Sequence, residues 1–219
     1  MMRQKFMRKE DKLRIRIDLK IFIFLIIFYF TNQLSIYLII MLFSILHEVG
    51  HIVVGLMLRF KPEKIEIMPF GVSVAFNKNN INEEYNEKNL NIREIFVALA
   101  GPITSLLLVI LTLKVDFKYI SKNSAIYSNL IILFFNLIPI YPLDGGRILK
   151  GILHIRLDSQ KTDYLIEKIS YITMIILTML SSIAVYYYQN IAIFFICIFL
   201  WLITLREKNG KTIDILQGK

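Results

Sequence analysis

Residues 21–58 form a long apolar stretch that constrains the fold more than any other feature of the chain. Apart from tyrosines, its only ionisable residues are His47, Glu48 and His51, within the sequence HEVGH. Ionisable groups at membrane depth are costly unless something compensates them, so they indicate a functional site. On a helix the two histidines project from one face, one turn apart, with Glu48 beside them. The pattern predicts a zinc site inside a membrane.

The composition agrees with a membrane protein. Hydrophobic residues make up 56% of the 219 residues and the mean hydropathy is +0.57, which is typical of a polytopic membrane protein. Cys197 is the single cysteine, which excludes an intrachain disulfide and a thiolate zinc cluster. The net charge of +9 is spread over segments between apolar runs, so we expect no nucleic-acid partner.

The apolar runs predict an all-α polytopic membrane protein with a short membrane-associated β-hairpin. A helix needs about 20 residues to cross the hydrocarbon, so the run at 169–205 is expected to divide at Gln189 and Asn190. The first span is short and includes Ile15 and Ile17 only if Arg16 extends outward to the membrane surface. Six spans are expected, at 15–31, 33–58, 93–113, 124–141, 166–188 and 191–206.

The basic residues predict the orientation of these spans. With the N-terminus in the cytoplasm, 23 of the 26 Lys and Arg residues fall on the cytoplasmic side. This distribution follows the positive-inside rule, so a multi-pass protein with both termini cytoplasmic is expected.

The segment 64–76 differs from the apolar runs. Ile65 and Ile67 alternate with charged residues, and the alternation resumes at Val72 after a Pro-Phe-Gly turn. A period of two broken by a turn predicts a β-hairpin directly after the motif helix, although an ordinary connecting loop is the alternative.

A catalytic zinc site typically has three protein ligands, so a third ligand is needed. Asp144 is the best candidate, because it is the only charged residue between Lys122 and Arg147. His154 lies among charged residues in an expected cytoplasmic loop between the fourth and fifth spans, and it is expected to be solvated. Prolines and glycines around Asp144 favour bent backbone, which membrane proteins tolerate only where it is buried or lines a wet cavity. A helix-capping role for Asp144 is the alternative.

Four motifs together resemble the site-2 protease family of intramembrane zinc metalloproteases. They are HEVGH at 47–51, PFG at 69–71, AGP at 100–102 and NLIPIYPLDGG at 136–146. The resemblance covers nearly the whole chain. It implies that one zinc ion is held by His47, His51 and Asp144 and that Glu48 is the catalytic base. It also implies supporting roles for Asn136 near the catalytic centre and for Phe70 and Gly71 in a hairpin that guides an extended substrate.

The resemblance further implies regulated intramembrane proteolysis of a membrane-associated pro-sigma factor during sporulation. Inhibitory membrane proteins are the expected partners, and the membrane surrounding the forespore is the expected location. We expect residues 1–219 to form a single protease domain without a CBS or PDZ domain. A non-catalytic zinc-binding scaffold is the main alternative, although it would have no use for Glu48. A zinc transporter is the third hypothesis, but the fifth and sixth spans offer no Asp, Glu or His beyond Glu167.

Overall fold

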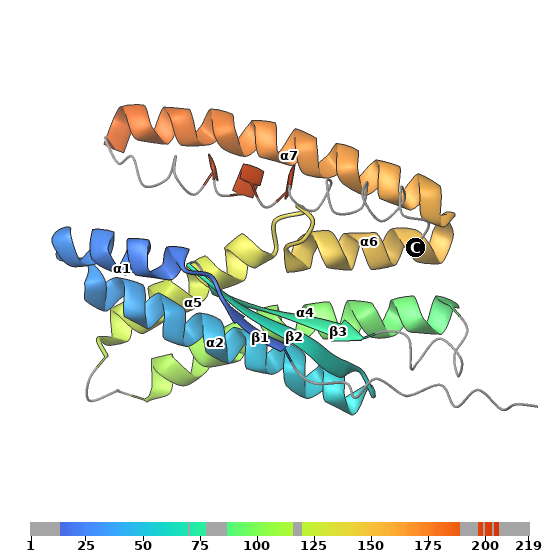
Figure 1. Ribbon diagram of the computed structural model, residues 1–219, viewed down its shortest axis with the longest axis horizontal. Coiled ribbons are helices and arrows are strands. Elements are labelled where there is room, and N and C mark those ends of the chain that lie inside the picture. The colour runs from blue at the N-terminus through green and yellow to red at the C-terminus, as the bar shows by residue number, and fades with distance from the viewer. Residues whose placement is uncertain are drawn as a thin grey trace, which may run out of the picture.

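The computed structural model describes residues 14–69, 71–77, 87–115 and 120–188, together with 197–198, 200–202 and 204–205. Helices dominate these residues, and a small sheet crosses one side of the helical layers (Figure 1). The elements are β1 (Arg14–Ile17), α1 (Lys20–Phe30), α2 (Leu34–Met57), β2 (Lys61–Met68), β3 (Gly71–Asn77), α4 (Glu87–Lys114), α5 (Lys122–Asn136), α6 (Asp144–Arg156) and α7 (Ser159–Tyr188).

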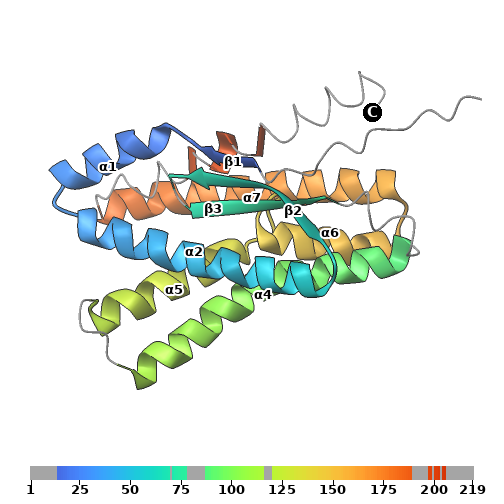
Figure 2. The same ribbon diagram turned by 60° about the horizontal axis from the view of Figure 1, so that its bottom comes forward.

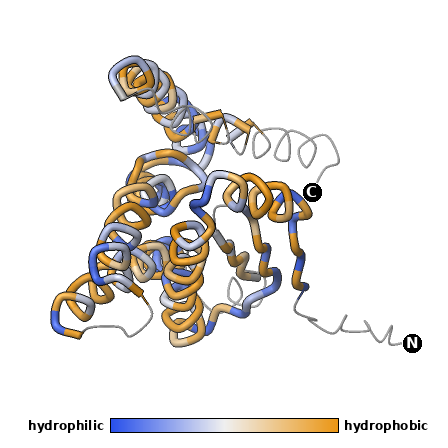
Figure 3. Tube along the Cα trace, turned by 90° about the vertical axis from the view of Figure 1, so that its left-hand side faces the viewer, coloured by the Kyte–Doolittle hydropathy of each residue, from blue (hydrophilic) through white to orange (hydrophobic). Residues whose placement is uncertain are grey.

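Three of the described helices are long and apolar enough to cross a membrane. They cover Leu34–Met57, Lys88–Lys114 and Ser159–Tyr187. Much of the helical part of the chain is hydrophobic along its length (Figure 3). Large apolar side chains also lie on the outer surface of these helices, as lipid contact requires. Examples are Leu38, Ile45, Val53, Leu107, Leu111, Ile176, Met179 and Ile183.

The first predicted span, 15–31, is wrong as a continuous helix. Residues Arg14–Ile17 form the exposed strand β1, and α1 has only 11 residues. At 1.5 Å per residue, α1 is about 16 Å long, roughly half the hydrocarbon thickness. The physical reason lies in the alternation of arginine and isoleucine in β1, which suits a strand whose neighbour supplies the backbone hydrogen bonds.

The second, third and fifth predicted spans correspond to α2, α4 and α7. The fourth, 124–141, is too long, because α5 ends at Asn136 and a turn containing Pro139 and Pro142 follows. The amphipathic helix α6 occupies a region that was expected to be a loop. Most of the sixth predicted span, 191–206, lies outside the described residues. A total of six spans therefore stays a prediction.

The predicted hairpin is present and is part of a larger sheet. β2 pairs antiparallel with β3, with Ile65 opposite Val74, and β1 pairs parallel with β2. The order β1-β2-β3 makes β3 an edge strand, and β3 packs along α2. The hairpin is close to α2 at its turn. The Tyr37 hydroxyl donates to the Pro69 carbonyl over 2.9 Å, and Gly71 lies so near Ser44 that a Cβ on Gly71 would collide with the serine hydroxyl.

Helix α4 is the centre of the helical packing and contacts α2, α5 and α6. Gly50 allows α2 to approach it closely, because a Cβ there would lie 2.9 Å from Thr104 Cβ and 3.0 Å from the Ala100 carbonyl oxygen. In Figure 2, α4 crosses α2 at an angle, and both helices lie beneath the sheet. This close packing brings the HEVGH face of α2 against α4.

Candidate metal centre

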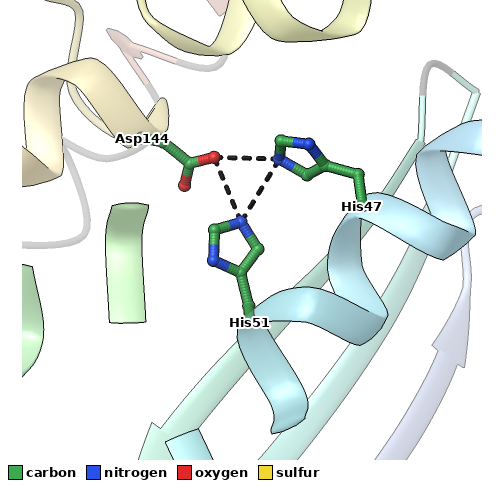
Figure 4. A group of neighbouring side chains, drawn as sticks. All are labelled: His47, His51 and Asp144. Carbon is green, nitrogen blue, oxygen red and sulfur yellow. Dashed lines mark hydrogen bonds and ion pairs between the residues drawn. The ribbon is translucent and has the colours of Figure 1, made fainter. Parts of the chain in front are cut away.

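The two motif histidines come from one face of α2 and point toward the same space (Figure 4). Both are almost completely buried, each with 1% of its surface exposed. Their Nε2 atoms lie 3.3 Å apart. The i, i+4 spacing of the sequence therefore produces the shared face that it predicted.

Asp144 reaches this space from the first residue of α6. Its Oδ2 lies 3.0 Å from His47 Nε2 and 3.1 Å from His51 Nε2. Leu143 occupies the N-cap position and no side chain caps α6, so the structure does not support the capping alternative for Asp144. Gly145 and Gly146 set the position of the helix start. A Cβ on either would collide with backbone atoms of the preceding turn, Leu137–Tyr141.

Helix α4 fixes the orientation of both imidazole rings. His47 Nδ1 lies 2.8 Å from Ser105 Oγ, and His51 Nδ1 lies 2.7 Å from the Val97 carbonyl oxygen. A carbonyl only accepts hydrogen bonds, so His51 Nδ1 carries the proton. In the neutral ring, His51 Nε2 is then left with a lone pair. Histidines that bind metals are typically held by such a hydrogen bond at the other ring nitrogen.

The donor set fits a zinc ion. Three acceptor atoms, two imidazole nitrogens and one carboxylate oxygen, converge with separations of 3.0 Å, 3.1 Å and 3.3 Å. Acceptors at such distances repel one another unless a cation or a proton lies between them. A tetrahedral centre with metal–ligand bonds of about 2.0–2.1 Å separates its ligand atoms by about 3.3 Å. His47, His51 and Asp144 are therefore positioned to form a zinc-binding site.

Gly101 on α4 keeps the space between these atoms open. A Cβ built on Gly101 would collide with the Nε2 atoms of both histidines and would lie 2.6 Å from His51 Cε1. Val97, Gly101 and Ser105 follow at intervals of four residues and so share one face of α4. The sequence motifs do not include Val97 or Ser105, and they include Gly101 only as part of AGP at 100–102. The sequence signal for Ser105 is a polar residue in an apolar helix, four residues after a glycine.

Two charged residues border the cluster. Glu48 is half-buried, one residue along α2 from His47, and its carboxyl group interacts with the backbone of Val74 in β3. The Arg147 guanidinium lies 3.6 Å from Asp144 Oδ1, the oxygen that does not face the histidines. Glu48 therefore lies between the metal site and the edge strand, and Arg147 contacts the oxygen of Asp144 that does not face the histidines.

The remaining predicted residues have different environments. Asn136 is half-buried and its amide donates to the Ile132 carbonyl of its own helix over 3.1 Å. Gly71 has a φ of +148° and lies against Ser44, one turn before His47. Phe70 lies outside the described residues. His154 is in the last turn of α6, apart from the His47, His51 and Asp144 cluster. The roles of Asn136, Phe70 and Gly71 stay predictions.

Comparison with known proteins identifies the family. Residues 35–123 and 118–180 match the model of Peptidase family M50. These matches cover more than half of the chain, and the chain belongs to this family. The fold is similar to that of the site-2 protease from Methanocaldococcus jannaschii, with a TM-score of 0.66 over 87% of this chain and 88% of that chain, at 24% sequence identity. The resemblance indicated by the four motifs is confirmed.

Two characterised relatives are similar in sequence. Stage IV sporulation protein FB from Bacillus subtilis is 30% identical over 145 residues, which are 64% of this chain and 48% of that protein. A zinc metalloprotease from Methanocaldococcus jannaschii is 35% identical over 128 residues, which are 55% of this chain and 33% of that protein. The chain thus spans about half the length of the first relative and a third of the second. Zinc as the metal agrees with the name of the second relative and with the geometry of the site.

Proposed function

We propose that this chain is a zinc-dependent intramembrane endopeptidase of the site-2 protease type. The observation that carries the proposal is the convergence of His47, His51 and Asp144 around a space kept open by Gly101, with Glu48 beside it. Family M50 membership and helices long enough to span a membrane support the same assignment.

The residues of the site divide the chemistry between them. Zinc, when bound, supplies Lewis-acid activation of water and of the scissile carbonyl. Glu48 accepts the proton from the attacking water and returns it to the leaving amine. Ser105 and the Val97 carbonyl hold the imidazole rings, so that both Nε2 atoms stay directed at the metal position. Burial of all three ligands limits the access of other water.

The edge strand β3 is the proposed substrate guide. Peptide bonds in a transmembrane helix are shielded by their own hydrogen bonds, so the substrate must unwind before attack. Strand addition to a sheet edge replaces those bonds with new main-chain hydrogen bonds. β3 is suited to this role because its Val74 backbone lies next to Glu48. A substrate strand laid along β3 would pass beside the proposed base.

The proposed substrate is a membrane-associated pro-sigma factor of sporulation, with inhibitory membrane proteins as partners and the membrane around the forespore as the location. Sequence similarity to Stage IV sporulation protein FB supports this choice. Co-expression with candidate pro-sigma factors tests it. We expect the wild-type protein to release a shortened product and Glu48→Gln to release none while it retains zinc. Equal cleavage by Glu48→Gln would overturn the role of Glu48.

A non-catalytic zinc scaffold remains the second hypothesis. It predicts zinc binding by the wild-type protein without cleavage of any membrane substrate. Intact Glu48 beside the ligands favours the enzyme, since a structural zinc site is closed by four ligands and has no need of a base.

The proposed topology places both termini in the cytoplasm, as the distribution of basic residues supports. Reporter fusions at residue 118 are expected outside the cell membrane, and fusions at residues 85 and 219 inside. An external signal at residue 219 would contradict the proposal of six spans.

A further inference from the structure

A cavity of about 260 Å³ lies between β3, α4, the turn before α6 and α6 itself. Four successive β3 residues, 73–76, form one wall. The other lining residues are Phe60, Glu94, Val97, Tyr141, Pro142, Arg147 and Lys150. None of these is a proposed metal ligand, and the mechanism described above gives the cavity no role.

Three lining residues connect the cavity to the catalytic centre. The Val74 backbone interacts with Glu48, the Val97 carbonyl accepts the hydrogen bond from His51, and Arg147 contacts Asp144. The cavity is therefore directly beside the metal site and on the same side as β3. A peptide that follows β3 past Glu48 must also pass the mouth of this cavity.

The size of the cavity favours a single side chain. Pockets for drug-sized ligands have volumes of about 300–1,000 Å³, so 260 Å³ is below that range. Successive side chains of a strand point to opposite faces. A strand paired with β3 would thus direct alternate side chains toward the helices, and one of them can enter the cavity.

The lining combines apolar walls with basic groups. Phe60 and Val97 are buried members of one apolar cluster, to which Phe76 also belongs. Among the lining residues, Arg147 and Lys150 are cations and Glu94 is the one carboxylate, and each cation is also paired with an aspartate outside the lining, Asp144 and Asp163 respectively. Such a surface suits a side chain with an apolar stem and an acidic end and disfavours lysine or arginine.

Lys150 is held in place by two contacts. Its Nζ lies 2.7 Å from Asp163 Oδ1 on α7 and 5.3 Å from the centre of the Tyr141 ring. Burial alone would lower the pKa of Lys150, but the hydrogen bond and charge of Asp163, together with Tyr141 and Glu94, raise the pKa above its usual value. The ammonium group is therefore charged at neutral pH and fixed at the cavity wall.

We propose that this cavity is a specificity subsite that binds one substrate side chain and selects glutamate over lysine. Lys150 and Arg147 are the specificity-determining residues. The inference rests on the proposed protease function and adds to it the class of side chain that the enzyme prefers next to the cleaved bond.

The test uses the purified protein in detergent with a library of randomised peptides, whose cleavage products are sequenced by mass spectrometry. The key variant combines Lys150→Asp with Asp163→Lys and so exchanges the two members of the ion pair. It retains opposite charges between α6 and α7 but places a carboxylate at the cavity. We expect the ratio of glutamate to lysine at one substrate position to fall at least about tenfold, as loss of a hydrogen bond to a charged group predicts. The matched control is Lys161→Asp with Asp158→Lys, which exchanges an exposed pair away from the cavity. The control is expected to keep the wild-type preference.

A second variant, Lys150→Met, keeps the length of the stem and removes the charge. It is expected to lose the glutamate preference without gaining one for lysine, and zinc content reports whether each variant is folded. Cleavage with an unchanged glutamate-to-lysine ratio in Lys150→Met or in the exchanged pair would overturn the subsite while the protease function stands. If the wild-type protein cleaves no more than Glu48→Gln, the proposed function fails, and the subsite fails with it.

Discussion

The metal centre and the cavity beside it differ in the kind of side chain that lines each of them. In the centre, three almost fully buried side chains face one another, Ser105 and the Val97 carbonyl on α4 hold the two imidazole rings, and Gly101 leaves the space between them open. The cavity is partly polar and lined by long side chains such as Lys150 and Arg147. A rigid, buried site suits chemistry that is the same for every substrate. A cavity that combines charged and apolar groups suits the choice of substrate.

The comparison predicts that changes in the centre abolish zinc binding, whereas changes along β3 and the cavity alter cleavage with zinc retained. The sharpest test is the pair Asp144→Ala and Glu48→Gln. Asp144→Ala removes one of three ligands, so zinc is expected to fall from about one per chain to near zero. Glu48→Gln is expected to retain zinc and lose activity. Metal analysis of both purified variants checks this. Equal zinc loss in the two variants would contradict the assignment of Asp144 as a metal ligand and of Glu48 as the base.

Gly101→Ala tests whether zinc binding requires the open space between the two histidines as well as the three ligands. The added Cβ would occupy the position between the two histidines, so zinc binding is expected to be largely lost although every ligand is intact. Gly55→Ala is the matched control on the motif helix. The three heavy atoms nearest to its Cβ would all belong to the ring of Phe76, the closest at 2.6 Å, and none to a metal ligand. Full zinc occupancy in Gly101→Ala would show that the space is not required.

Ser105→Ala tests the ring anchor, with a smaller expected effect. Loss of the contact to His47 Nδ1 is expected to weaken zinc affinity about 10–100-fold, as for other groups that orient metal ligands. Competition with a chelator measures this affinity. Ser181→Ala is the control, because Ser181 is equally buried but bonds to Thr178 on α7. The same affinity in both variants would exclude an orienting role for Ser105.

Val74→Pro tests the edge strand and should have the smallest effect on the metal. Proline removes the backbone donor next to Glu48, so cleavage is expected to fall about three- to tenfold, the range of one lost main-chain hydrogen bond. Zinc content should stay near that of the wild-type protein. Val74→Thr keeps the donor and the branched shape and serves as the control. Joint loss of zinc and activity in Val74→Pro would show instead that β3 supports the fold.

The sequence was sufficient where a signal is local and periodic. The i, i+4 spacing of His47 and His51 predicted a shared helix face, and α2 has this geometry. Alternating residues in 64–76 predicted the hairpin, which is present as β2 and β3. Asp144 was identified as the third candidate because it was an isolated charge between prolines and glycines, and it meets both histidines.

Two local signals were present but were read incorrectly. Arginine and isoleucine alternate over 14–17, which is typical of a strand, but the need for a 20-residue span favoured a helix there. In α6, apolar residues recur at helical spacing from Ile148 to Leu153, yet its basic residues were attributed to a loop. In both cases the requirement for membrane-spanning length outweighed the periodicity of the residues themselves.

The sequence by itself determined the chemistry of the ligands and the face on which two of them lie, because helical periodicity acts over a few neighbouring residues. Tertiary structure decided what surrounds them. Val97, Gly101 and Ser105 acquire their roles only when α4 packs against α2, and Asp144 lies 93 residues from His51 along the chain. The parallel pairing of β1 with β2 and the cavity between β3 and α6 also depend on contacts between distant segments. No local pattern encodes such contacts, because they form only where separate faces meet at packing distance.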